Sequence, residues 1–314
     1  MLKDVVVIAP ASIANLGLLF DIAAVAIDYA YDKVLVRMVG EGSTRVKVYA
    51  EGGVLGGEAN VAYHAAINML NDLGEAIELE IVVRKGVPVG VGLGSSGATA
   101  AATVYAINML LGEVLSREEL VKYAGLGEAV AAGEPHYDNV AASLLGGLTL
   151  VYDVDKAVIE KIEWPQSYRI VVFRPKRNIL RIDRQVPKTK AMREVLPRYV
   201  PRKRVVEVTR KALLFKYYAS LGEWSRAFNM LNDGWEIEAS RSKLIPGYDA
   251  AKEAALRAGA KAFNIAGAGP AIFAIVEECD VENVVREVNT ILSRTWSEYE
   301  VKIVNVDNVG ARVV

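Results

Sequence analysis

Residues 89–97 read V-G-V-G-L-G-S-S-G, and this stretch decides how the rest of the chain is interpreted. Three glycines stand at every second position, and two serines then lead into an alanine-rich run at residues 98–111 that has helical length and good helix formers. Glycines let a backbone approach a bulky anion. A turn at a helix N-terminus directs several free N–H groups and the positive end of the helix dipole at one point. The sequence therefore predicts a phosphate-binding loop.

Two better-known phosphate loops do not fit the surroundings of this stretch. Residues 92–97 match G-x-G-x-x-G, but that dinucleotide motif opens directly from a strand and meets an acidic residue at the end of a second strand about 20 residues later. Here residues 85–88 separate the loop from the strand-like run 79–83, and Ser116 begins a second helix where the second strand should lie. A Walker A loop needs a lysine that is missing after these glycines. A third kind of phosphate loop remains, beside the alternative of a glycine-rich turn without a ligand.

Composition limits the classes of protein that fit. The 314 residues are 52% hydrophobic and 24% charged, enough for two domains with substantial cores. The net charge of −1 gives no sign of a nucleic-acid or membrane-surface partner, and no apolar run reaches the roughly 18 residues of a membrane span. Cys279 is the single cysteine, and two histidines cannot complete a Cys/His zinc site with it. The N-terminus begins as a strand and not as a signal peptide, so we expect a cytoplasmic protein.

The first half of the chain mixes predicted strands and helices without the regular alternation of a doubly wound sheet. Strands are expected at residues 5–9, 29–39, 45–50, 79–83 and 144–151. Helices are expected at residues 60–73, 98–111 and 120–132. The pattern loosens at residues 156–167, where we place a domain boundary.

The second half begins with a strand at residues 170–173 and continues into a basic, proline-bearing connection at residues 174–204. Long connections of this kind are usually functional or disordered. Helices are expected at residues 207–218, 224–232, 248–258 and 281–295, and strands at residues 262–266, 271–277 and 301–306. This order predicts an α+β domain with an antiparallel sheet, and hence two domains at residues 1–160 and 161–314.

Polar residues within apolar surroundings mark further candidate sites. Asn15 and Asp21 stand in an otherwise apolar stretch, so they either cap local backbone or face a ligand. Glu128 has apolar neighbours along its predicted helix, which favours a buried carboxylate that needs a cation over a solvated one. With a hydroxyl group from Ser95 or Ser96, this carboxylate could hold Mg²⁺ beside bound phosphates.

Three more clusters lie at turns between predicted elements, where binding residues tend to occur. Residues 136–139 are four polar or amphipathic residues in succession, which is typical of a site, although a lone histidine is more often structural. Arg193 and Arg241 lie in loops, where arginines are usually solvated, but two that converged would clamp a carboxylate or phosphate. The glycine-rich turn 266–270 is either a plain hairpin or a backbone surface against a ligand.

Taken together, these segments resemble the GHMP kinases, a family named for galacto-, homoserine, mevalonate and phosphomevalonate kinases. The resemblance runs almost end to end and rests on three motifs, at residues 10–21, 88–97 and 265–270. The members that phosphorylate homoserine are the most similar. That finer resemblance rests on H-Y-D-N-V-A at 136–141, residues 189–197, Arg241 with P-G at 246–247, and G-A-R at 310–312.

The resemblance implies a two-domain α+β GHMP kinase fold, with an N-terminal domain like domain 2 of ribosomal protein S5 and a ferredoxin-like C-terminal domain. It also implies a cytoplasmic, homodimeric enzyme of threonine biosynthesis with no nucleic-acid or membrane partner. Its reaction would be transfer of a phosphoryl group from ATP, with Mg²⁺, to the side-chain hydroxyl of the small molecule L-homoserine.

The same resemblance assigns candidate residues. ATP would lie against Asn60, Val61, Pro88, Val89, Gly90, Val91, Gly92, Leu93, Gly94, Ser95 and Ser96. Mg²⁺ would be held by Ser96 and Glu128. Homoserine would contact Asn15, Asp21, His136, Asn139, Thr189, Arg193, Arg241 and Gly267, with both arginines on its carboxylate. Asn15 and Asn139 would orient the reacting hydroxyl, and Asp138, the nearby candidate for a catalytic base, is interpreted as structural.

Some positions depart from the family pattern, and two alternatives stay open. Leu19 replaces a glycine of the first motif, Ala142 stands where a proline is usual, and Ala266 and Ala268 replace serines. Residues 174–188 form a longer segment than usual. The chain could instead be a mevalonate or archaeal shikimate kinase, since these acceptors are also carboxylates. It could also be a non-catalytic, nucleotide-binding regulator, although the Mg²⁺ ligands are present.

Overall fold

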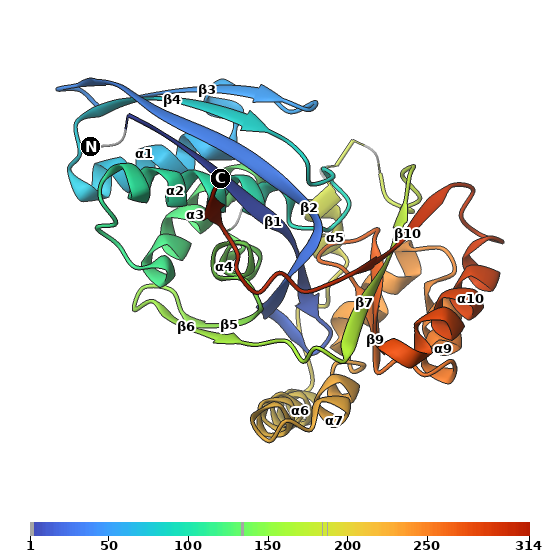
Figure 1. Ribbon diagram of the computed structural model, residues 1–314. Helices are drawn as coiled ribbons and strands as arrows, with labels where there is room; N and C mark the ends of the chain where they lie inside the picture. Colours follow the sequence, from blue (N-terminus) through green and yellow to red (C-terminus); the bar gives the residue numbers. More distant parts are fainter. Residues whose placement is uncertain (1–2, 133–134, 184, 187) are drawn as a thin grey trace. The chain divides into compact units, whose positions relative to one another are not determined.

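The structure, a computed structural model, describes residues 3–132, 135–183, 185–186 and 188–314 (Figure 1). Two compact units are formed. The first takes in the described parts of residues 1–14, 21–163 and 306–314, and the second takes in those of residues 15–20 and 164–305. No helix in the described part of the chain combines the length and the apolar character that a membrane span requires.

The expected partition at residues 1–160 and 161–314 places the boundary three residues before that of these units, and it differs from them in two further segments. The C-terminal residues join the first unit because β11 (Arg312–Val313) pairs with the edge of β1. Residues 15–20 join the second unit because the indole N–H of Trp235 donates to the Leu18 carbonyl (3.1 Å). Gly17 packs so closely there that a Cβ atom would lie 1.7 Å from the carbonyl oxygen of Leu231.

A seven-stranded sheet of the described residues forms the frame of the first unit, in the order β11-β1-β2-β4-β3, with β5 and β6 continuing from β2. Its strands are β1 (Asp4–Leu16), β2 (Leu19–Glu41), β3 (Arg45–Glu51), β4 (Ile77–Arg84), β5 (Leu148–Asp153), β6 (Val158–Ile162) and β11. Parallel pairing occurs between β3 and β4, and β4 alternates buried and partly exposed residues as a half-buried strand does.

Four helices pack together in the first unit: α1 (Val61–Leu73), α2 (Ser95–Leu110), α3 (Arg117–Ala132) and α4 (Tyr137–Leu145). The alanine-rich α2 contacts the other three and is buried on nearly all sides, as its uniform apolar composition predicts. Gly127 lets α3 approach α1, because a Cβ atom there would lie 2.7 Å from the Cβ of Ala65. The small residues therefore set the close packing around the helix that follows the phosphate loop.

An antiparallel sheet of four described strands forms the second unit, in the order β10-β7-β9-β8, so the predicted α+β class is confirmed. The strands are β7 (Tyr168–Pro175), β8 (Ala262–Ile265), β9 (Ile272–Glu277) and β10 (Tyr299–Val304). The helices are α5 (Lys188–Glu194), α6 (Arg202–Ser220), α7 (Trp224–Met230), α8 (Trp235–Arg241), α9 (Tyr248–Arg257) and α10 (Val281–Leu292). Short 3₁₀ turns lie at Gly57–Ala59, Ser242–Leu244 and Glu278–Asp280.

Several elements differ from the sequence prediction. The first strand was expected to end at residue 9, but β1 runs on to Leu16 and meets β2 in a tight hairpin. The helix α4 was missed, because its polar first turn was interpreted as a site and its end as a strand. The strand β6 was missed because none of its residues is fully buried, which leaves little hydrophobic alternation to detect.

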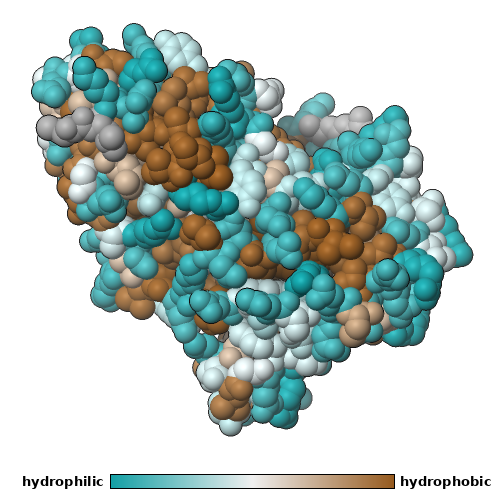
Figure 2. Space-filling model, in the orientation of Figure 1, coloured by the Kyte–Doolittle hydropathy of each residue, from teal (hydrophilic) through white to brown (hydrophobic). Residues whose placement is uncertain are grey.

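Hydrophobic side chains also reach the surface, where Figure 2 shows them as separate brown patches divided by hydrophilic residues. The helix α6 carries several of them, and its only buried residues are Val208, Phe215 and Ala219. On the face that Figure 2 shows, the apolar surface is therefore divided into separate patches, as is usual for folded proteins.

Candidate active site

The predicted phosphate loop lies between β4 and α2. Gly90, Gly92 and Gly94 adopt φ values of 75°, 93° and 63°, a left-handed conformation that glycine tolerates best. A Cβ atom on Gly94 would lie 2.0 Å from Ser12 Oγ and 2.9 Å from Asn139 Oδ1, so the position has room only for hydrogen. Because Gly94 is the N-cap of α2, no side chain at that position caps the N–H groups of the first turn. This geometry fits the anion site that the sequence predicts, which stays a prediction.

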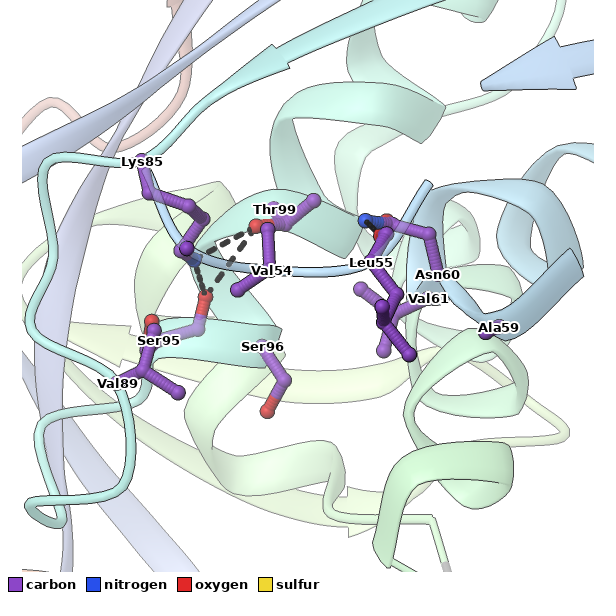
Figure 3. Close-up of a pocket in the computed structure, with 11 residues that line it drawn as sticks. Val54, Leu55, Ala59, Asn60, Val61, Lys85, Val89, Ser95, Ser96 and Thr99 are labelled. Carbon is purple, nitrogen blue, oxygen red and sulfur yellow. Dashed lines mark hydrogen bonds between the residues drawn. The ribbon is translucent and has the colours of Figure 1, made fainter. Parts of the chain in front are cut away.

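A cavity of about 330 Å³ lies beside the start of α2, within the size range of small-molecule sites (Figure 3). Figure 3 shows Lys85 and Asn60 at opposite ends of it. Its lining residues are Gly53, Val54, Leu55, Ala59, Asn60, Val61, Lys85, Val89, Ser95, Ser96 and Thr99. The side chain of Asn60 accepts a hydrogen bond from Ala62 N and donates one to the Leu55 carbonyl, so it fixes the N-terminus of α1 at the cavity wall.

Five of these lining residues are among those that the family resemblance assigns to ATP, namely Asn60, Val61, Val89, Ser95 and Ser96. The other predicted loop residues, Pro88, Gly90, Val91, Gly92, Leu93 and Gly94, lie outside the cavity lining. Leu93 is fully buried, and its carbonyl accepts a hydrogen bond from Ser12 N (3.2 Å), which ties the loop to β1.

A buried ion pair at one end of the cavity was not predicted. Lys85 pairs with the fully buried Asp32, and its ammonium also donates to the Ser95 carbonyl (2.7 Å) and to Thr99 Oγ1 (2.9 Å). Asp32 Oδ1 accepts hydrogen bonds from the N–H groups of Gly86 and Val87, both at 3.0 Å. Burial lowers the pKa of Lys85, and the charge of Asp32 opposes that shift. This pair therefore joins the start of the phosphate loop to the first turn of α2.

A signal for this pair was present in the sequence. Asp32 lies in the predicted strand 29–39, at a position that alternates in phase with Val34 and Val36, and both valines are fully buried. A carboxylate on the inward face of a strand needs a partner.

The two predicted metal ligands are in direct contact. Ser96 Oγ donates to Glu128 Oε1, and Glu128 is only 3% exposed. Burial raises the pKa of Glu128 to about 7, and the charge of Asp138 adds to that shift. Glu128 Oε2 has no hydrogen-bond partner in the described part of the chain, and His136 Nδ1 lies 3.9 Å from it. A buried carboxylate with an unused oxygen beside a hydroxyl group fits a divalent cation.

The predicted cluster at residues 136–139 forms the beginning of α4. Asn139 Oδ1 accepts a hydrogen bond from Ser12 Oγ (2.9 Å), and a Cβ atom on Gly97 would lie 3.3 Å from the Cβ of Asn139. The structure therefore brings Asn139 next to the phosphate loop. Asp138 is buried, and its Oδ1 accepts a hydrogen bond from the N–H of Asn139 (2.7 Å).

A small pocket in the second unit collects other predicted residues. It is lined by Asn15, Gly17, Phe20, Gly234, Ile237, Glu238, Arg241, Ile265 and Gly267. Arg241 is 3% exposed and donates to the carbonyls of Met192 (3.0 Å) and Gly267 (3.3 Å). Its guanidinium lies 5.0 Å from the centre of the Phe20 ring, and that of Arg193 lies 5.9 Å from the same centre. The two predicted arginines thus converge on one ring.

The remaining predicted acceptor residues lie around the first motif and α5. Asn15 and Asp21 both adopt left-handed backbone conformations, with φ of 59° and 56°, and Asp21 is exposed. Thr189 lies in the first turn of α5, directly after Lys188. Lys188 was not predicted, although its ammonium donates to the Gly269 carbonyl (2.5 Å).

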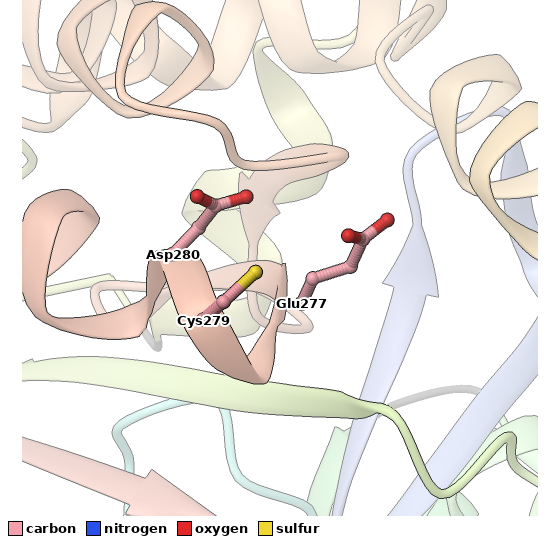
Figure 4. Close-up of side chains that lie close together, drawn as sticks. All are labelled: Glu277, Cys279 and Asp280. Atoms are coloured by element: carbon pink, nitrogen blue, oxygen red, sulfur yellow. The ribbon is translucent and has the colours of Figure 1, made fainter.

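A second set of possible metal ligands lies at the end of β9, where Glu277, Cys279 and Asp280 come close together (Figure 4). Glu277 is already engaged, because it pairs with Lys261 (3.2 Å) and accepts a hydrogen bond from Tyr168 Oη (3.2 Å). The group therefore does not compete with Ser96 and Glu128 as the candidate metal site.

A kinase of small molecules is the class that this fold and these sites define, and the comparisons agree. The models of the GHMP kinases N terminal domain and of the GHMP kinases C terminal match residues 60–147 and 212–293. The chain belongs to the GHMP kinase family.

Homoserine kinases are among its relatives within the family. One from Thermoplasma acidophilum is 38% identical over 91% of this chain and 89% of the relative. Another, from Aeropyrum pernix, is 39% identical over 85% of each. The solved homoserine kinase of Cytophaga hutchinsonii is similar at a TM-score of 0.86 and 30% identity, covering 100% of this chain and 98% of that one. The family resemblance predicted from the sequence is thus confirmed.

Proposed function

We propose that this chain transfers the terminal phosphoryl group of ATP to the side-chain hydroxyl of L-homoserine, the reaction that its relatives' names describe. The observation that carries the proposal is the convergence of Arg193 and Arg241 on Phe20, whose ring lines the same pocket as Arg241, Asn15 and Gly267. A pair of guanidinium groups suits the carboxylate of an amino acid, because each can donate two parallel hydrogen bonds.

Phosphoryl transfer depends mainly on positioning and on neutralising charge. The loop backbone and the first turn of α2 would bind the ATP phosphates, and the cavity beside Asn60 and Val61 would take the rest of the nucleotide. Ser96 and Glu128 would hold Mg²⁺, which when bound neutralises phosphate charge.

The acceptor hydroxyl needs orientation more than a strong base. Asn15 and Asn139 are the amides that would supply it. We assign Asp138 a structural role, because its carboxylate accepts the N–H of Asn139 and so holds the first turn of α4. Asp21, His136, Thr189 and Gly267 complete the proposed acceptor contacts. The predicted homodimer and cytoplasmic location stay predictions.

An ADP-release assay with L-homoserine, mevalonate, shikimate and galactose tests this function. We expect kcat/KM to be highest with L-homoserine, by at least about 100-fold, and turnover to stop when EDTA removes Mg²⁺. Preference for mevalonate or shikimate would instead assign the chain another acceptor within the family. Absence of turnover with all four would favour a nucleotide-binding regulator.

A further inference from the structure

Two cations from different helices reach one glycine-rich turn of the second unit. The turn, residues 266–270, connects β8 to β9. Arg241, at the end of α8, donates to the Gly267 carbonyl at 3.3 Å. Lys188, at the start of α5, donates to the Gly269 carbonyl at 2.5 Å. The two side chains therefore hold positive charge on the same short segment, beside the pocket that Arg241 and Gly267 line.

The surroundings of Lys188 disfavour the charged form of its side chain. Burial lowers the pKa of Lys188 to about 8, and the nearby charge of Arg241 contributes to the lowering. Other lysines of the same unit lie beside carboxylates, since Lys252 pairs with Glu238 and Lys261 pairs with Glu277. A desolvated cation held next to a like charge is unfavourable unless an anion joins the pair. The geometry around Lys188 is therefore that of a site completed by an anionic ligand.

We infer that Lys188 is a third cation for the acceptor carboxylate, acting with Arg193 and Arg241. The inference rests on the proposed function and deepens it, because it names a side chain that selects carboxylate acceptors.

A purely structural role for Lys188 predicts a different result from a role in binding the carboxylate. If Lys188 only ties α5 to the turn, then any side chain that donates a hydrogen bond to the Gly269 carbonyl should replace it. The variant K188Q keeps an N–H donor and removes the charge, so it separates the two roles. Lys190 supplies a matched control, because it lies on the same helix, is exposed, and faces Glu194 at 3.9 Å.

The experiment measures KM for L-homoserine, for ATP and for L-homoserinol, in which a hydroxymethyl group replaces the carboxylate. We expect K188Q to raise the KM for L-homoserine about tenfold or more, with the other two values within about twofold of wild type. K188R should stay within about threefold for all three, and K190Q should match wild type. Melting temperatures identify any variant that fails to fold, and if K188Q fails, K188M against K190M carries the comparison because both variants remove the charge.

Two results would overturn the inference: an unchanged KM for L-homoserine in K188Q, or an equal rise for L-homoserine and L-homoserinol. Failure of the proposed function looks different. If wild type prefers another carboxylate acceptor, homoserine is wrong as the substrate, and the same variants test Lys188 with that acceptor. If wild type phosphorylates no carboxylate at all, both proposals are wrong.

Discussion

The nucleotide cavity and the acceptor pocket handle positive charge in opposite ways. In the cavity, the ammonium of Lys85 is matched by Asp32, and its three hydrogens are directed to Asp32, Ser95 and Thr99. At the proposed acceptor pocket, Arg241 lines the pocket and donates to one turn, Lys188 donates to a second carbonyl of that turn, and their like charges lie close together. The comparison supports a proposal in which phosphates would be bound mainly by backbone N–H groups on a neutralised frame, whereas the acceptor would be bound by side-chain charge.

Breaking the Asp32–Lys85 pair should have the largest effect. Asp32→Asn leaves a buried ammonium without its counter-charge, which we expect to lower the free energy of unfolding by about 3–5 kcal/mol. The double variant D32N/K85M removes both charges and should recover part of that loss. Urea unfolding of wild type, D32N, K85M and the double variant measures the coupling. Purely additive losses would show that the pair does not stabilise the frame.

The second largest effect is expected for a substitution in the predicted phosphate loop. Gly94→Ala places a methyl group 2.0 Å from Ser12 Oγ at a φ of 63°, so the loop must move and its N–H groups lose their common direction. We expect kcat/KM for ATP to fall by at least about 100-fold. Gly112→Ala is the matched control, because Gly112 also has a positive φ, 86°, but a Cβ atom there meets nothing within 4 Å. Equal losses in both variants would attribute the effect to backbone strain alone.

A change in the proposed acceptor pocket should alter the KM for L-homoserine and not the KM for ATP. Arg241→Leu removes one arm of the proposed carboxylate clamp and should raise the KM for L-homoserine about tenfold or more, while the KM for ATP stays near wild type. Arg226→Leu is a control on the same unit, since Arg226 pairs with Glu223 at the surface. An unchanged KM for L-homoserine in R241L would remove Arg241 from the clamp.

The two regions also differ in how much of their geometry can be predicted from the sequence. The geometry of the predicted phosphate loop could be anticipated because its glycines, its serines and the helix α2 are neighbours in the sequence, so local chemistry fixes their arrangement. The convergence of Arg193 and Arg241 could be anticipated only through the family resemblance. Lys188 contacts a carbonyl 81 residues away, and nothing in its local sequence distinguishes it from the exposed Lys190.

Parts of the fold escaped prediction for related reasons. The helix α4 has only 9 residues and carries polar groups in its first turn, so its sequence favours a loop with a site as much as a helix. The hairpin tip at residues 15–20 joins the second unit through Trp235 and Leu231, which are distant in sequence. Asp32 was also missed, although its inward position on a strand was readable from the alternation with Val34 and Val36.

The smallest predicted effect is a pH dependence that belongs to the acceptor pocket alone. Because the pKa of Lys188 is lowered to about 8, its ammonium is lost as the pH rises through that value, and attraction for the carboxylate falls with it. Arg241 and the Gly269 carbonyl face this group, and neither titrates in the range concerned. We expect the KM of wild type for L-homoserine to rise about threefold more between pH 7 and pH 9 than that of K188Q. The amino group of the substrate titrates identically in both assays, so the ratio of the two KM values isolates Lys188. A ratio that stays constant across this range would mean that the charge of Lys188 does not act on the acceptor.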